Sequence, residues 1–169
     1  MMDGKTRTAT VLARGRSDHP ATWALGSLFE RVASGTETGG AFGLSLVTQP
    51  TGTATPLHVH SAEAEAFFLL DGTMTYRAGE ETYQLSDGSF IYLPAGVPHA
   101  FRVTGTSPVR FLAIAAPGGL MDLYDDVGRP ADRLVLPDAD DQQMQADIGR
   151  WLEAAPSYGI QVVGPPLPG

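Results

Sequence analysis

The chain contains no cysteine and has few basic residues for its acidic content. Without cysteine, neither a disulfide nor a thiolate metal site can form. Nineteen acidic residues stand against eleven basic ones, which gives a formal net charge of −8 at pH 7. Binding to nucleic-acid phosphates favours the opposite balance, so a nucleic-acid partner is not expected.

Long hydrophobic segments are also missing from the chain. The N-terminal residues 1–20 are polar, and no apolar segment of a secretory signal follows them. The longest apolar stretch begins at residues 111–116 and is far too short to cross a bilayer. Together with the lack of cysteine, these absences predict a soluble, cytoplasmic protein that does not insert into membranes.

Short strands separated by turns dominate residues 23–116. Asp71-Gly72 and Asp87-Gly88 are strong turn signals, because glycine readily adopts the positive φ angles that tight hairpins need. Regular short strands with such turns predict an all-β fold, a sandwich or barrel of antiparallel sheets. The expected strands cover residues 25–33, 41–48, 56–60, 66–70, 73–78, 82–85, 90–93, 100–104 and 109–116.

Helical spacing replaces the strand pattern after residue 119. Apolar residues on one helical face predict a helix over 120–127, ended by Gly128. A second helix is expected over 138–154, with Asp138 as its N-cap. The apolar face of this second helix would consist of Met144, Ile148, Trp151 and Leu152.

The chain is thereby divided into three parts, although its 169 residues suit a single domain. Residues 1–22 are expected to form a loose N-terminal arm and residues 23–117 the β-barrel. Residues 118–169 are expected to form a helical extension that packs on the barrel or on a partner subunit. Pro156 and the proline-rich residues 164–169 are expected to end regular structure.

Three of the four histidines lie in two short blocks that also contain a glutamate. His58 and His60 alternate on one predicted strand, so both side chains project from the same face. Glu65 begins the next strand, and His99 begins a later one. Facing inward together, they would place three imidazoles and one carboxylate around one point. This donor set suits a divalent transition metal: nickel, iron, manganese, cobalt, copper or zinc.

An isolated His-x-His on a strand is more often a pair of surface histidines than a pair of ligands, so the surrounding framework matters. The two blocks read Gly52-x5-His58-x-His60-x4-Glu65-x6-Gly72 and Gly88-x5-Pro94-x-Gly96-x2-His99. They resemble the two signature motifs of the cupin superfamily, with Val103 as a departure where asparagine is common. The resemblance implies a cupin double-stranded β-helix, a jelly-roll-like barrel with the metal inside.

The flanking segments resemble a narrower group, the single-domain bacterial quercetin 2,3-dioxygenase-like cupins. The segments that carry this resemblance are Trp23-Ala24-Leu25-Gly26-Ser27, Thr38-Gly39-Gly40-Ala41-Phe42, Pro117-Gly118-Gly119, Tyr158-Gly159-Ile160 and Gly164-Pro165-Pro166. The resemblance implies a metal-dependent dioxygenase, an oxidoreductase that cleaves a flavonol or related 3-hydroxy-4-oxo aromatic with O2.

Residue roles follow from the same resemblance. Glu65 is implied as the catalytic base as well as a metal ligand. Phe67, Phe101, Met74 and Tyr76 are candidates for the substrate pocket, with ordinary barrel core as the competing interpretation for Met74 and Tyr76. Barrels of this kind often pair through an edge strand, so a homodimer is expected.

Two other functions remain open from the sequence. One is a different metal-cupin enzyme: an isomerase, a decarboxylase or a tailoring oxygenase of secondary metabolism. The other is a non-catalytic cupin that binds a small molecule. No DNA-binding helix-turn-helix accompanies the predicted barrel, which disfavours a one-chain transcriptional regulator.

Overall fold

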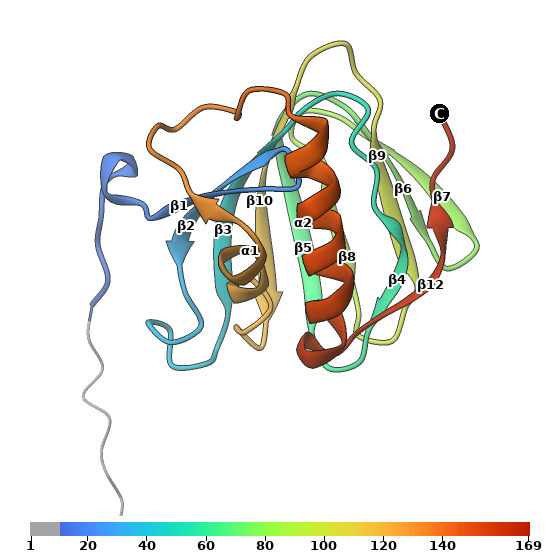
Figure 1. The fold of residues 1–169 in the computed structure, drawn as a ribbon. Helices are drawn as coiled ribbons and strands as arrows, with labels where there is room; N and C mark the ends of the chain where they lie inside the picture. Colours follow the sequence, from blue (N-terminus) through green and yellow to red (C-terminus); the bar gives the residue numbers. More distant parts are fainter. Residues whose placement is uncertain (1–10) are drawn as a thin grey trace, which may run out of the picture.

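Two antiparallel sheets form a barrel in the computed structural model, which describes residues 11–169 (Figure 1). The first sheet has the strand order β11-β1-β2-β3-β10-β5-β8, and the second has the order β12-β4-β9-β6-β7. The predicted all-β class is confirmed. The strands of the first sheet are β1 (Ala21–Ala24), β2 (Ser27–Ala33), β3 (Gly43–Gln49), β5 (Ala64–Asp71), β8 (Phe90–Leu93), β10 (Val109–Ala116) and β11 (Arg129–Pro130). Those of the second are β4 (Pro56–His60), β6 (Met74–Ala78), β7 (Glu81–Leu85), β9 (His99–Val103) and β12 (Ile160–Pro166).

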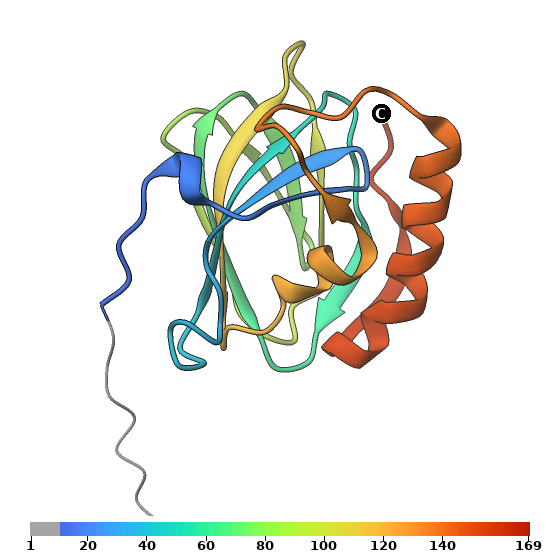
Figure 2. The ribbon, with the colours of Figure 1, turned by 60° about the vertical axis from the view of Figure 1, so that its left-hand side comes forward.

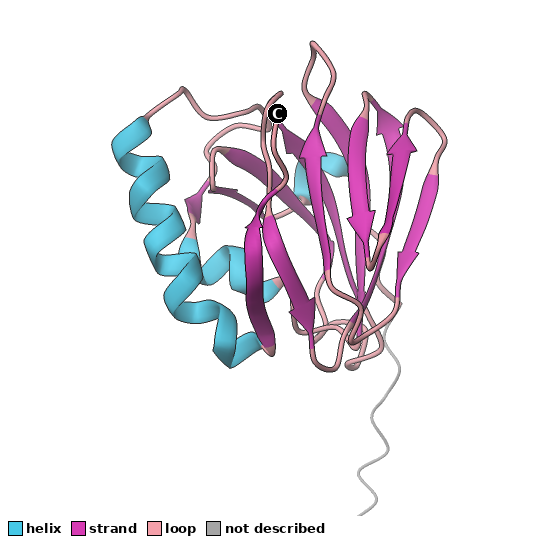
Figure 3. Ribbon diagram, turned by 90° about the vertical axis from the view of Figure 1, so that its right-hand side faces the viewer, coloured by secondary structure: helices cyan, strands magenta, loops and turns pink. Residues whose placement is uncertain are grey.

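The helices gather mainly in the C-terminal part of the described chain. They are α1 (Asp122–Val127) and α2 (Asp141–Ala154), with two short 3-10 helices, η1 (Arg16–Asp18) and η2 (Ala155–Tyr158). Figure 2 shows α2 running alongside the barrel, and Figure 3 shows α1 and α2 on the same side of the two sheets. Within residues 11–169, no helix is long and apolar enough to cross a membrane.

Strand alternation builds the barrel interior. On β10, Val109, Phe111, Ala113 and Ala115 are buried, whereas the residues between them are partly exposed. A strand sends successive side chains to opposite faces, so this pattern marks one inward and one outward face. Ala113 pairs with Phe67 of β5, and adjacent inward residues therefore form one continuous apolar surface.

The structure differs from the predicted single strand over 25–33, because residues 25 and 26 form the turn of a hairpin. The structure divides this region into β1 and β2, with Leu25 and Gly26 as the turn between them. Both residues have positive φ angles, +52° and +68°, as a two-residue hairpin requires. The backbone N–H of Leu25 donates to Asp147 Oδ2 at 2.8 Å, so helix α2 helps to hold this unfavourable leucine conformation.

The start of the second predicted helix also needs correction. The helix begins at Asp141, and its N-cap is Asp140 rather than Asp138. Asp140 has an extended backbone conformation, and its Oδ1 accepts from the Gln143 backbone N–H at 2.9 Å. Asp138 lies outside the helix and contacts Arg133 instead.

Asp140→Ala is expected to lower the free energy of unfolding by about 1 kcal/mol, because an orphan N–H of the first helical turn loses its side-chain acceptor. Asp138→Ala serves as the control and should change stability by less than about 0.5 kcal/mol, since its ion pair is exposed. Urea denaturation of the two variants measures both values. Equal losses would contradict the assignment of Asp140 as the cap.

The C-terminal prolines do not end regular structure as expected. Strand β12 runs through Pro165 and Pro166 and pairs with β4, with Ile160 opposite His60. Because β12 is an edge strand, only one of its sides must supply ladder hydrogen bonds, and proline is tolerated there. The segment after residue 118 therefore contains a strand that supports the histidine-bearing strand β4.

The first ten residues of the predicted N-terminal arm lie outside the described part of the chain. From residue 11 onward, the arm contains η1 and then enters β1 at Ala21. Arg16 donates to both carboxylate oxygens of the buried Glu30, at 2.8 and 2.6 Å. This bidentate pair attaches the described portion of the arm to the barrel.

Candidate metal centre

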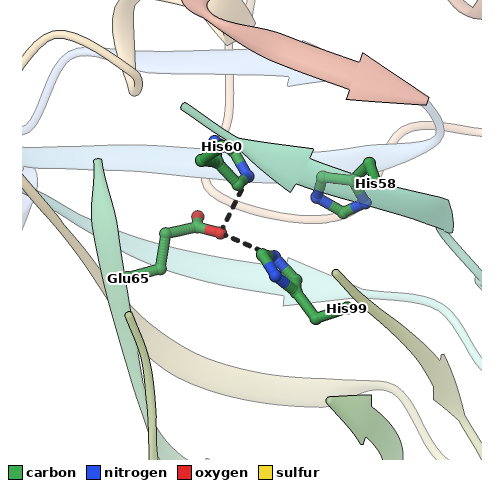
Figure 4. A group of neighbouring side chains, drawn as sticks. All are labelled: His58, His60, Glu65 and His99. Atoms are coloured by element: carbon green, nitrogen blue, oxygen red, sulfur yellow. Dashed lines mark hydrogen bonds and ion pairs between the residues drawn. The ribbon is translucent and has the colours of Figure 1, made fainter. Parts of the chain in front are cut away.

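Three histidines and one glutamate from three strands converge inside the barrel (Figure 4). His58 and His60 lie on β4, Glu65 lies on β5, and His99 begins β9. All four are buried, and their candidate ligand atoms lie within 4.8 Å of one another. His58 stands opposite His99 in the antiparallel register of β4 and β9. The fold thus brings the four side chains to one interior point.

Backbone carbonyls orient two of the imidazole rings. His58 Nδ1 lies 2.7 Å from the Pro56 carbonyl oxygen, and His99 Nδ1 lies 2.9 Å from that of Val97. A carbonyl oxygen can only accept, so Nδ1 of each ring carries the hydrogen and donates it. In the neutral ring Nε2 then has a free lone pair, which is the form in which histidine binds a metal.

The carboxylate of Glu65 lies between two of the imidazoles. Its Oε2 is 3.1 Å from His60 Nε2 and 3.1 Å from His99 Nε2. Burial acts to raise the pKa of Glu65, but the contacts with His60 and His99 outweigh burial and hold this pKa below its ordinary value. Burial, followed by the effect of nearby His99, lowers the pKa of His58 to about 4, so this ring is neutral at pH 7.

Some contacts in this cluster are favourable only with a proton or a cation between the atoms. His99 donates through Nδ1, so its ring, when it carries no second proton, presents the Nε2 lone pair to Glu65 Oε2. Both ring nitrogens of His60 are buried, and neither makes a hydrogen bond within the described chain, despite the short distance from Nε2 to Glu65. Buried polar atoms of this kind are costly without a partner.

A divalent transition metal fits these four residues. A cation at their common point would neutralise the carboxylate and satisfy the imidazole lone pairs that point inward. The set of nitrogen and oxygen donors suits manganese, iron, cobalt, nickel, copper and zinc. Because the chain supplies four ligands, a bound ion that takes more than four would also have coordination positions for a substrate or water.

The model of the cupin domain family matches residues 45–115, which run from β3 to β10. This segment contains all four residues of the metal cluster and the strands that carry them. The chain contains a cupin domain. The resemblance inferred from the two histidine-containing blocks is confirmed.

Known proteins extend the likeness beyond the matched domain. The quercetin 2,3-dioxygenase of Bacillus subtilis is 32% identical over 124 residues, which cover 73% of this chain but only 36% of that protein. An ectoine synthase from P. lautus matches with a TM-score of 0.60 at 19% identity, covering 77% of this chain and 94% of the other. A predicted oxalate decarboxylase from Thermotoga maritima matches with a TM-score of 0.56 at 18% identity, covering 63% and 99%. At these identities, the two solved structures show a shared fold.

The metal cluster of this cupin borders a cavity of about 520 Å³, a volume typical of small-molecule sites. Phe67, Tyr76 and Phe101, three residues predicted for the substrate pocket, line it. The ring of Tyr76 packs against both of the others, with centroid distances of 5.4 Å to Phe67 and 5.3 Å to Phe101. Met74 is fully buried in the core but is not among the described residues that line the cavity.

Several other cavity residues are not identified from the sequence pattern. They are mainly apolar and include Phe29, Val47, Gln49, Phe111, Met121 and Tyr124. Strand alternation gives a signal that some of these residues face inward. It does not indicate which inward residues border open space and which are packed against neighbours, because the arrangement of distant elements decides this.

Helix α2 forms one wall of the cavity in this cupin. The apolar face predicted from helical spacing, Met144, Ile148, Trp151 and Leu152, lines the cavity. The Trp151 ring packs edge-on to His58, with a centroid distance of 6.2 Å. The C-terminal part of the chain therefore shapes the surroundings of the metal cluster.

Proposed function

We propose that this cupin is a metal-dependent, quercetinase-like dioxygenase that cleaves a flavonol or a related 3-hydroxy-4-oxo aromatic with O2. The observation that carries the proposal is the position of the histidine and glutamate cluster in the wall of a largely aromatic and aliphatic cavity. The 32% identity with the B. subtilis quercetin 2,3-dioxygenase supports the same substrate class.

The chemistry of the cavity wall favours a flat, neutral ligand over a small anion. Phe67, Phe101 and Phe111 offer aromatic surface, against which a ring system gains by burial and by edge or face packing. Among the described residues that line the cavity there is neither lysine nor arginine. Apart from a metal ion in the cluster, a small dicarboxylate would find no cationic group there, and it would leave the apolar walls uncovered, which favours a ring system over an oxalate-type substrate.

In the proposed reaction, Glu65 takes the proton from the 3-hydroxyl of the ligand. Oε2 of Glu65 faces His60 and His99, whereas Oε1 makes neither contact, and we assign Oε1 as the proton acceptor. A divalent ion, when bound, would supply Lewis acidity toward the resulting oxyanion. His58 and His99 are already oriented by backbone carbonyls, so they need little reorganisation during the reaction.

The aromatic and aliphatic walls would hold the ring system in place and exclude water from the cleavage step. The overall reaction balances without an external reductant. Both atoms of O2 remain in the cleaved product, and one ring carbon leaves as carbon monoxide.

Oxygen uptake and carbon monoxide release test this function. The protein is reconstituted separately with nickel, cobalt, manganese and iron and is then supplied with quercetin. At least one metal form is expected to consume O2 and release carbon monoxide in equal amounts. Flavone, which lacks the 3-hydroxyl, serves as the control and should not be consumed. No turnover of any flavonol at full metal occupancy would exclude the proposed dioxygenase and leave another metal-cupin reaction or a binding role.

A further inference from the structure

Apart from His60 of the metal cluster, two buried side chains that line the cavity have a polar atom with no hydrogen-bond partner within residues 11–169. They are Tyr76, through its hydroxyl, and Gln49, through Oε1. Tyr76 is 0% exposed and Gln49 is 7% exposed. An unpaired polar group at this depth costs free energy, which an apolar side chain of similar shape would avoid. Their position beside open space points to a ligand that supplies the missing partners.

The hydroxyl groups of the two threonines in the cavity wall are already satisfied. Thr53 Oγ1 donates to the Pro50 carbonyl oxygen at 2.8 Å, and Thr55 Oγ1 accepts from the Phe101 backbone N–H at 3.0 Å. These threonines therefore have local structural partners, whereas Tyr76 and Gln49 do not. The contrast singles out Tyr76 and Gln49 as candidates for ligand recognition.

Tyr76 lies near the metal cluster. It pairs with Phe101 across β6 and β9, and Ala78, two residues further along β6, pairs with the ligand residue His99. Two residues on a strand span roughly 7 Å, so a single bound ring system is large enough to contact both Tyr76 and the cluster. Its hydroxyl can donate to an oxygen of a ligand that reaches the metal site.

Gln49 lies at the other end of the barrel interior. It pairs with Val109 of β10, whereas Ala115 of the same strand pairs with Glu65. The interval from Val109 to Ala115 corresponds to about 20 Å of strand, at about 3.3 Å per residue. A ligand that reaches from the metal cluster toward Gln49 must therefore be elongated.

We propose that Tyr76 and Gln49 recognise the two ends of one ligand. Tyr76 donates to a ligand oxygen close to the metal cluster, and the amide of Gln49 pairs with a hydroxyl on the remote ring. This inference rests on the proposed dioxygenase function and narrows its substrate class to flavonols hydroxylated on their outer rings.

Binding of two flavonols to the zinc-loaded protein without oxygen tests the inference apart from turnover. Quercetin carries hydroxyls on both outer ring systems, whereas 3-hydroxyflavone carries only the 3-hydroxyl. The unmodified protein is expected to bind quercetin about tenfold more tightly than 3-hydroxyflavone, because one well-formed hydrogen bond can account for a difference of this size. Gln49→Leu should weaken quercetin binding about tenfold and leave 3-hydroxyflavone binding unchanged. Tyr76→Phe should weaken both by a similar factor, about five- to tenfold.

Thermal unfolding of the ligand-free proteins separates recognition from a structural role. Gln49→Leu and Tyr76→Phe should leave Tm unchanged or raise it, because each removes an unpaired buried polar atom. A lower Tm with unchanged flavonol affinity would overturn the inference. So would equal affinities of all three proteins for both flavonols, or no binding of either flavonol.

The outcomes also distinguish this inference from the proposed function. The expected binding pattern without oxygen consumption would refute the dioxygenase and retain the recognition roles. Normal quercetin turnover, with unchanged affinities in both variants, would retain the dioxygenase and refute the roles of Tyr76 and Gln49.

Discussion

The His99→Ala protein is expected to lose stoichiometric metal binding, with its metal affinity lowered about a hundredfold or more. His99 supplies one of four candidate ligand atoms, and its ring is held in place by the Val97 carbonyl at 2.9 Å. Loss of a partner that merely orients a ligand costs about 10- to 100-fold in metal affinity, so loss of the ligand itself should reach at least the upper end. Metal content after dialysis, measured by mass spectrometry, gives the occupancy.

His19→Ala is the matched control, because His19 is the one histidine of the chain that lies outside the cluster. Its Nδ1 is 3.8 Å from Glu30 Oε2, and its loss should leave metal occupancy intact. Metal at a hundred times Kd stabilises a folded protein by about 2.7 kcal/mol. At the same metal concentration, this gain should persist in His19→Ala and vanish in His99→Ala. Full occupancy in His99→Ala would refute its assignment as a ligand.

The metal cluster follows from the sequence in two steps of different kinds. The spacing of His58 and His60 requires only that the segment be a strand, since alternate residues then share a face. The meeting with His99 requires β4 and β9 to pair with His58 opposite His99, and no local pattern specifies that register. The resemblance of the two blocks to cupin motifs provides this long-range information.

The residues of the cavity wall are only partly predictable from the sequence. The alternation along a strand indicates which residues face inward, but not which of them border the cavity. Met74 and Tyr76 share the inward phase of β6, yet only Tyr76 is among the described cavity residues. Gln49 is in phase with the buried Val47, but a glutamine near the end of a strand carries no local signal that it is buried and unpaired. Such positions become recognisable only when the sheets are placed against each other.

Two backbone features were missed for a similar reason. A leucine gives no sequence signal for a positive φ, so the turn at Leu25 depends on the pairing of β1 with β2 and on Asp147 of α2. The prolines of β12 indicate a break when read locally. Their acceptability depends on the edge position of that strand, which is a property of the whole sheet.

Truncation of Leu69 to alanine is expected to lower the free energy of unfolding by about 3 kcal/mol, within the range of about 2–5 kcal/mol for such core changes. Leu69 of β5 is 0% exposed and belongs to the hydrophobic core. It is not among the described cavity residues, so its loss would leave a void in packed structure. Tm should fall by about 6–12 °C for a domain of this size. Denaturation at one fixed metal concentration measures the change.

Leu70→Ala is the matched control, because the next residue on the same strand faces outward. Leu70 is 42% exposed, so its truncation should cost less than about 1 kcal/mol. Both variants should keep full metal occupancy, because neither leucine supplies a ligand. Glu65 and Phe67 share the inward phase of Leu69 on β5. Comparable losses of stability in the two variants would therefore contradict the position of Leu69 in the core. They would also contradict the assignment of Glu65 to the inward face of β5, on which its place in the metal cluster depends.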